Sequence, residues 1–260
     1  MPFTLAHPAA VIPLCQRLRF QGVMSALVIG SMAPDFVYWL PSPYYRETSH
    51  TIPGLFGFCL PAGFLVFWLY HTLIKHPLVS LLPQSIFVRL PQTQSIHWRF
   101  GTIVQVLLAL LLGAISHTVW DAFTHHGTSV TRLLPFLETP LLTEGDYVLR
   151  LYKVLQYGST VGGLGLLAIG IRRWYERTPP RDNIRVEVLS AWQKAFLITC
   201  LTVPSVIGAL RSGLYQARWE ASLKTLQTFL VSGVITGIGI FSLVLVTLGL
   251  LWPWVQRREG

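Results

Sequence analysis

Three residues of the kind that bind metal ions follow one another at four-residue spacing: His117, Asp121 and His125. In a helix, residues at i, i+4 and i+8 project from one face, so these side chains would point the same way. The stretch just upstream, residues 106–115, is apolar apart from Gly113 and is typical of a membrane span. Ionisable groups at the edge of a span are costly and favour a functional site. We therefore expect a metal-binding group at the end of a membrane helix.

The other candidates for this chemistry come from separate stretches of the chain: His7, Asp35, His50 and His126. Imidazole and carboxylate groups suit Zn²⁺, Mn²⁺ or Fe²⁺ at about 2.0–2.2 Å. Two cations would need a bridging ligand, and Asp35 or Asp121 is suited to that role. We predict a divalent metal, with zinc favoured, and the following ligands: His7, Asp35, His50, His117 and Asp121.

Two further pairs of residues complete the predicted site. His125 or His126 is the predicted catalytic proton donor. Arg46 and Arg132, on the same side of the membrane, are predicted to contact an anionic head group of the substrate.

Each predicted ligand also has a plainer interpretation. His7 could cap a short interfacial helix, Asp35 follows a proline and could form a turn, and His50 could be a solvated loop residue. His125 and His126 lie beside Gly127, where the helix should end, and a histidine there is favourable to the helix dipole.

The composition indicates what kind of chain positions these residues. It has 260 residues, of which 52% are hydrophobic and only 12% charged, whereas soluble domains carry about 25% charged residues. The net charge of +9 does not predict a nucleic-acid partner, because the basic residues cluster between apolar segments, as they do in cytoplasmic loops. We predict an integral membrane protein whose partners are membrane lipids and, alternatively, other membrane protein subunits.

Five apolar stretches are long enough to cross a bilayer, which takes roughly 20 residues. They cover residues 53–74, 102–120, 154–171, 195–214 and 228–252. Two weaker segments, 7–18 and 20–32, are interpreted as a helical hairpin, and Pro34 and Pro41 are expected to end its second helix. The predicted fold is therefore all-α and multi-spanning, with six to seven helical segments.

One membrane domain over residues 1–260 is expected, with a metal-site half at 1–127 and a helical scaffold half at 128–260. In the scaffold half, Gln156, Ser159 and Thr160 are expected to form hydrogen bonds between helices. Gly162 and Gly163, with other nearby glycines, are expected to permit close helix packing.

The charge of the loops predicts an orientation. Residues 75–101 and 172–194 are basic and should be cytoplasmic, whereas 121–150 carries four acidic residues against two arginines and should be external. The N-terminus would then lie outside, the C-terminus inside, and the metal site at the external face. We predict the bacterial inner membrane as the location.

Four motifs support a family resemblance. They are Met1-Pro-Phe-Thr-Leu-Ala-His7-Pro8, Gly30-Ser-Met-Ala-Pro34-Asp35, Ser49-His50-Thr51 and Ser116-His117-Thr-Val-Trp-Asp121-Ala-Phe-Thr-His125. As a set they resemble an uncharacterised bacterial membrane family, domain of unknown function 4184. Their order is also similar to that of the bacterial inner-membrane metal-dependent hydrolases, which more distantly resemble zinc phospholipase C. Those hydrolases usually have an acidic residue and a histidine after Pro-Asp, where this chain has Phe36-Val37-Tyr38.

The residues and the resemblance together predict a function. We expect a metal-dependent hydrolase of a phosphoester in a lipid or lipid-linked substrate. The alternative is a non-catalytic accessory subunit of a larger membrane complex, in which a metal would be structural. Transport is disfavoured, because the centres of the predicted spans contain almost no ionisable residues.

Overall fold

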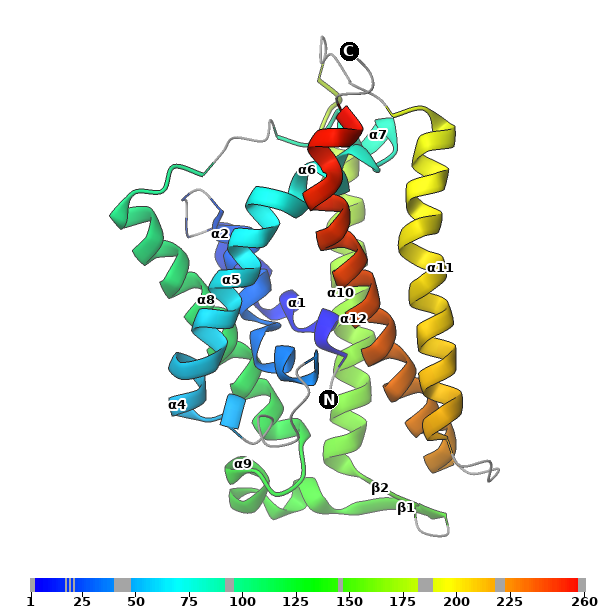
Figure 1. The fold of residues 1–260 in the computed structure, drawn as a ribbon. Coiled ribbons are helices and arrows are strands. Elements are labelled where there is room, and N and C mark those ends of the chain that lie inside the picture. Colours follow the sequence, from blue (N-terminus) through cyan, green and yellow to red (C-terminus); the bar gives the residue numbers. More distant parts are fainter. Residues whose placement is uncertain are drawn as a thin grey trace. The chain divides into compact units, whose positions relative to one another are not determined.

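A computed structural model describes residues 3–16, 18, 20, 22–39, 48–91, 96–144, 147–181, 189–217 and 223–256. Its helices include five that are long and apolar enough to cross a membrane (Figure 1). They are Ile52–Ser80, Phe100–Thr124, Leu151–Arg177, Ala191–Gln216 and Lys224–Val255. The predicted class, an all-α multi-spanning membrane protein, is confirmed.

The outward faces of these helices are those of a membrane protein. Large apolar side chains such as Val161, Ile171 and Leu243 are exposed. Exposing a long apolar helix to water would be unfavourable, whereas lipid tails solvate it. The chain is therefore a membrane protein by the composition and length of its helices.

The chain forms two compact units. The first consists of Met1–Phe67 and Ser95–Glu176, and the second of Trp68–Gln94 and Arg177–Gly260. The helix Ile52–Ser80 contributes residues to both.

The first unit begins with short elements. A 3₁₀-helical turn at Thr4–Ala6 leads into α1 (Pro8–Val11) and a second turn at Ile12–Gln16. Helix α2 (Val23–Gly30) follows, and then the 3₁₀ helix Ala33–Trp39.

The rest of the first unit is built on longer helices. The helix Ile52–Ser80 starts with α4 (Ile52–Gly54), a π-helical turn at Leu55–Cys59 and α5 (Leu60–Leu69). After the long α8 (Phe100–Thr124) come α9 (Ser129–Leu133) and a 3₁₀ turn at Pro135–Glu138. The antiparallel strands β1 (Pro140–Glu144) and β2 (Tyr147–Arg150) then lead into α10 (Leu151–Arg177).

Helix α2 packs closely on α8, and glycine makes the approach possible. A Cβ on Gly113 would lie 2.5 Å from both Leu27 O and Ser31 N, and one on Gly30 would collide with the backbone of Leu110. Leu27 and Leu110 are buried at this contact. Because α8 carries His117 and Asp121, this contact fixes the position of both residues along the axis of α8 relative to the end of α2.

The prediction for the N-terminal segment is wrong in one respect. Helix α2 ends at Gly30, before Pro34, and Pro34 lies inside the 3₁₀ helix Ala33–Trp39. Proline has no N–H to donate, but the first turn of a helix does not require one there. Pro41 lies outside the described residues.

The second unit contains the end of the first span, two short helices and the last two long helices. A π-helical turn at Tyr70–Ile74 precedes α6 (Lys75–Ser80) and α7 (Gln84–Phe87). Helices α11 (Ala191–Gln216) and α12 (Leu223–Gln256) pack along each other. Small residues bring them together, since a Cβ on Gly237 would lie 3.1 Å from Ala209 Cβ. The amine of Lys194 donates to Leu82 O at 2.8 Å and ties α11 to the loop before α7.

Candidate metal centre

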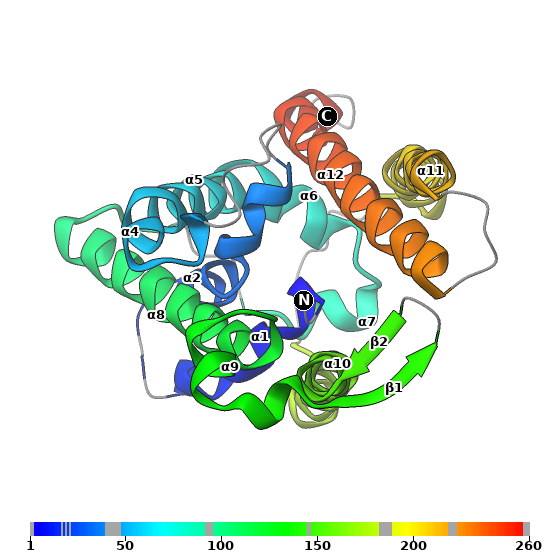
Figure 2. The same ribbon diagram turned by 90° about the horizontal axis from the view of Figure 1, so that it is seen from below.

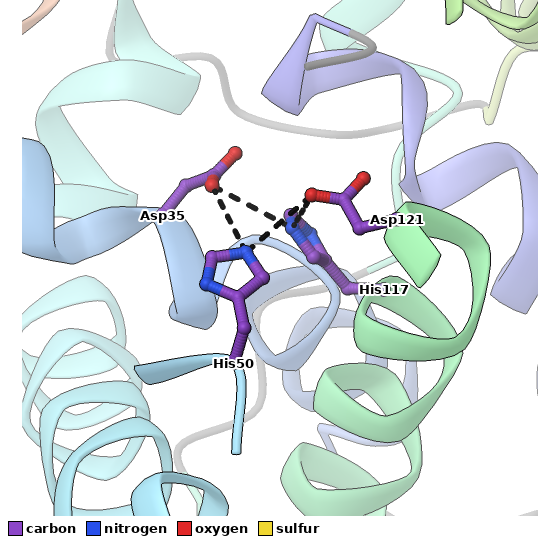
Figure 3. A group of neighbouring side chains, drawn as sticks. All are labelled: Asp35, His50, His117 and Asp121. Carbon is purple, nitrogen blue, oxygen red and sulfur yellow. Dashed lines mark ion pairs between the residues drawn. The ribbon is translucent and has the colours of Figure 1, made fainter. Parts of the chain in front are cut away.

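Three elements of the first unit bring four side chains to one point (Figure 3). Asp35 comes from the 3₁₀ helix Ala33–Trp39, and His50 lies just before the helix Ile52–Ser80. His117 and Asp121 lie one turn apart near the end of α8. One donor atom from each of the four lies within 4.8 Å of the others, so the group could hold a metal ion.

Four of the six separations between the donor atoms are close to those of ligands around one cation. His117 Nε2 lies 3.5 Å from Asp35 Oδ1 and 3.4 Å from Asp121 Oδ2. His50 Nε2 lies 3.4 Å from Asp121 Oδ2 and 3.8 Å from Asp35 Oδ1. Ligands held about 2.0–2.2 Å from a tetrahedral ion are separated from one another by roughly 3.3–3.6 Å. Three of these four distances fall in that range and the fourth is slightly longer, and the two remaining pairs lie within 4.8 Å.

The group is buried, and several of its atoms lack a hydrogen bond. His117 is 0% exposed, Asp35 2% and Asp121 4%. Among the described residues, no hydrogen-bond partner is found for His117 Nε2, Asp35 Oδ1 or Asp121 Oδ1. Buried polar atoms without partners are costly and rare in folded proteins. The carboxylate oxygens and imidazole nitrogens of this group point toward a common centre, and a cation bound there would satisfy them.

The backbone sets the orientation of His117. Its Nδ1 lies 2.7 Å from Ser31 O at the end of α2. A carbonyl oxygen only accepts, so Nδ1 carries a proton and Nε2 is directed at the two carboxylates, where it would give up its own proton to bind a cation. Metal-binding histidines are commonly held in this way by a second group. The close packing of α2 on α8 is what places Ser31 O within reach.

One oxygen of the Asp35 carboxylate, Oδ2, is held by a hydrogen bond. Thr4 Oγ1 donates to Asp35 Oδ2 at 2.6 Å, which leaves Oδ1 directed at His117 and His50. Burial alone would raise the pKa of Asp35, but the close approach and charge of protonated His117 and the hydrogen bond from Thr4 outweigh it. The pKa of Asp35 therefore lies below its ordinary value, and the group is a carboxylate at neutral pH.

His7 lies beside this group without being one of its four members. Its ring stacks on that of His117, with centroids 3.7 Å apart, and its Nε2 lies 3.6 Å from Asp121 Oδ1. No hydrogen-bond partner of that Nε2 is found among the described residues. Burial, followed by the charge of His117, lowers the pKa of His7 to about 3, so the imidazole is neutral.

The two predicted proton donors are placed differently. His125 follows the last residue of α8, and its Nδ1 lies 3.0 Å from Asp121 O and 3.6 Å from Asp121 Oδ2. His126 pairs with Glu138, both of whose carboxylate oxygens lie 2.9 Å from His126 Nδ1. His125 is therefore at the edge of the group, whereas His126 is exposed and engaged elsewhere.

The two arginines predicted to bind a head group are not part of the cluster. The guanidinium of Arg132 is exposed and donates to Gly127 O and Thr128 O. Arg46 lies outside the described residues.

Sequence reasoning did not single out Thr4, Ser31 or Glu138. The hydroxyl of Thr4 and the carbonyl of Ser31 act through local backbone geometry, which leaves no spacing pattern in the sequence. Glu138 has no sequence signal beyond its charge.

Comparison with known proteins places the chain in a family. No curated protein and no solved structure is significantly similar to it. The family model described as "Domain of unknown function (DUF4184)" matches residues 1–246, which is nearly the whole chain. The protein therefore belongs to the DUF4184 family.

Proposed function

We propose that this protein binds a divalent metal ion, zinc being favoured, through Asp35, His50, His117 and Asp121, and that it hydrolyses a phosphoester. The observation that carries the proposal is the convergence of four buried or half-buried donors at the spacing of metal ligands. Two imidazoles and two carboxylates form a donor set that suits zinc, manganese or iron. A cation held there would polarise a phosphoester and activate a water molecule.

The exposure of the ligands supports access from one side. The side chain of His50 is 21% exposed and that of His125 is 19% exposed, whereas His117 is fully buried. A substrate would therefore approach over His50 and His125. His7 and His125 both lie next to Asp121 and are the imidazoles best placed to move a proton during the reaction.

The position of the cluster in the helices favours a lipid or lipid-linked substrate. His117 and Asp121 lie in the last turns of one span, and His50 lies just before the start of another. A site near the end of two membrane helices is at the depth of a lipid head group. The basic stretch 75–101 begins at the other end of the helix Ile52–Ser80, which supports a site on the external face of the membrane. The bacterial inner membrane is the location that we propose.

A structural metal in an accessory subunit is the second candidate. Four protein donors around one zinc ion are typical of closed structural sites, whereas catalytic sites keep one position open. Substitution of Co²⁺ for zinc distinguishes the two candidates. Added phosphate changes the visible absorption spectrum of bound Co²⁺ only if a coordination position is open to it.

The first experiment measures metal content. Detergent-purified wild type is compared with the double variant His117→Ala/Asp121→Ala, and His76→Ala, which removes an exposed histidine of the second unit, is the matched control. We expect close to stoichiometric metal in wild type and His76→Ala and none in the double variant. Absence of metal from all three after zinc is added back would overturn the proposal.

The second experiment measures hydrolysis. Zinc-loaded and EDTA-treated protein are incubated with mixed micelles of phosphatidylglycerol or phosphatidic acid, and water-soluble phosphate products are quantified. Release that depends on zinc and is lost in the double variant supports the enzyme. A metal-loaded protein that releases nothing and shows no response of its Co²⁺ spectrum to phosphate supports the accessory subunit.

A further inference from the structure

Helix α10 supplies no candidate ligand, yet one of its faces is turned inward. Tyr152, Gln156, Thr160 and Gly163 follow at spacings of four, four and three residues, which places them on a single helix face. Tyr152 and Gln156 are buried and the other two are half-buried, whereas Tyr157, Val161 and Leu164 on the other faces are exposed. The inward face of a span that otherwise meets lipid must contact protein.

One contact of this face is a hydrogen bond to the N-terminal segment. Phe3 N donates to Thr160 Oγ1 at 3.0 Å. The same hydroxyl donates to Gln156 O at 3.0 Å. Its hydrogen is therefore directed along α10, and a lone pair is left to accept from Phe3.

A second contact requires a glycine. A Cβ on Gly163 would lie 2.9 Å from Ala6 O and 3.0 Å from Ala6 Cβ, closer than side-chain atoms normally approach. Ala6 is buried in this contact. The neighbouring Gly162 has open space, since a Cβ there would meet nothing within 4 Å. In both ribbon views the start of the chain lies between α8 and α10 (Figures 1 and 2).

The segment held by these two contacts carries two side chains that contact the metal centre. Thr4, directly after Phe3, donates to Asp35 Oδ2. His7, directly after Ala6, stacks on His117 and approaches Asp121. Moving the segment would shift both at once.

We infer that α10 is a positioning helix for the metal centre, and that Thr160 and Gly163 hold the N-terminal segment so that Thr4 and His7 meet Asp35 and His117. The expected effect on metal binding rests on the proposed metal centre, but the placement of His7 is tested without metal. Thr160 and Gly163 are positioning residues, because neither contacts a donor atom of the cluster.

The first test measures the accessibility of His7 in EDTA-treated protein. Gly163→Val is compared with Gly162→Val, which adds the same side chain one residue away into open space. Modification of His7 by diethylpyrocarbonate is followed by mass spectrometry of the N-terminal peptide, and circular dichroism checks the helix content of each variant. We expect several-fold faster modification in Gly163→Val and the wild-type rate in Gly162→Val. Equal rates in the two folded variants would overturn the inference.

The second test measures the metal site. Removing a group that orients a metal ligand typically lowers metal affinity by about 10–100-fold, and we expect a loss of this order in Gly163→Val and in Thr160→Val. Thr160→Ser keeps the hydroxyl and should restore both the affinity and the Co²⁺ spectrum. A Thr160→Ser variant as defective as Thr160→Val would count against the hydrogen bond.

The two tests separate two kinds of failure. If wild type binds no metal, the proposed function fails, while the accessibility of His7 still decides whether α10 positions the segment. If wild type binds metal but Gly163→Val and Gly162→Val bind it equally well, the positioning role fails and the metal centre stands.

Discussion

At the scale of single residues, the cluster depends on groups that hold its members in place. His117 is oriented by a backbone carbonyl, and Asp35 is oriented by the hydroxyl of Thr4. The positions of the metal ligands therefore depend on residues that are not themselves of metal-binding type.

The hydroxyl of Thr4 offers a direct test of this dependence. Thr4→Val removes the donor to Asp35 Oδ2 at nearly constant volume, so the carboxylate is free to turn away from His117. We expect metal affinity to fall roughly 10-fold or more, with little change in helix content. Thr4→Ser, which keeps the donor, should bind metal like wild type. Isothermal titration of zinc into chelator-treated protein measures both variants.

The carboxylate of Asp35 predicts a pH dependence of the metal-free protein. Its pKa is lower in the folded state than in the unfolded chain, so its contribution to stability is present above the unfolded pKa of about 3.9. That contribution is lost as the pH falls towards the folded value. In EDTA, the melting temperature of wild type should therefore fall more steeply below about pH 4 than that of Asp35→Asn. Parallel curves for the two proteins would show that this carboxylate is not stabilised by its neighbours.

At the scale of elements, the sequence predicts the long spans well and the short pieces poorly. A run of about 20 apolar residues specifies a membrane helix by itself, because the backbone must satisfy its hydrogen bonds internally in lipid. The segments before Trp39 are shorter and contain several prolines, so local patterns do not distinguish α-helix from 3₁₀ turns there. The hairpin of β1 and β2 was not predicted either, since its two strands are only five and four residues long.

The same limit applies to the candidate site. Residue types at the edges of spans indicate which histidines and aspartates to consider. Their grouping depends on how the short elements fold back against α8, and this information is not local. The exclusion of His126 from the cluster, through its pairing with Glu138, depends on a turn that has no pattern in the sequence.

Helix packing gives a prediction at the same scale. Gly113→Ala places a Cβ against the backbone at Leu27 and Ser31, which must separate α2 from α8. Overpacking of this kind costs about 1–3 kcal/mol, and we expect a lower melting temperature in detergent. Metal affinity should also weaken, because Ser31 O holds His117. Gly101→Ala on the same helix is the control, because a Cβ there meets nothing within 4 Å.

At the scale of the whole molecule, all four cluster members and His7 belong to the first unit. A ligand that binds only the folded state stabilises it by about 2.7 kcal/mol at a free concentration 100 times its Kd. This stabilisation should be concentrated in the elements that supply the donors. The second unit, with α11 and α12, supplies none among its described residues.

Hydrogen exchange with and without EDTA tests this division in the intact protein. Metal removal should increase exchange in residues 3–39 and at the end of α8, because the cation connects these segments through Asp35, His117 and Asp121. Exchange in α11 and α12 should not change. The double variant His117→Ala/Asp121→Ala should show no response to EDTA in either unit, which separates the metal from a direct effect of the chelator. An equal response of both units in wild type would mean that the metal stabilises the chain as one cooperative body, and the site could then act on the last two helices as well.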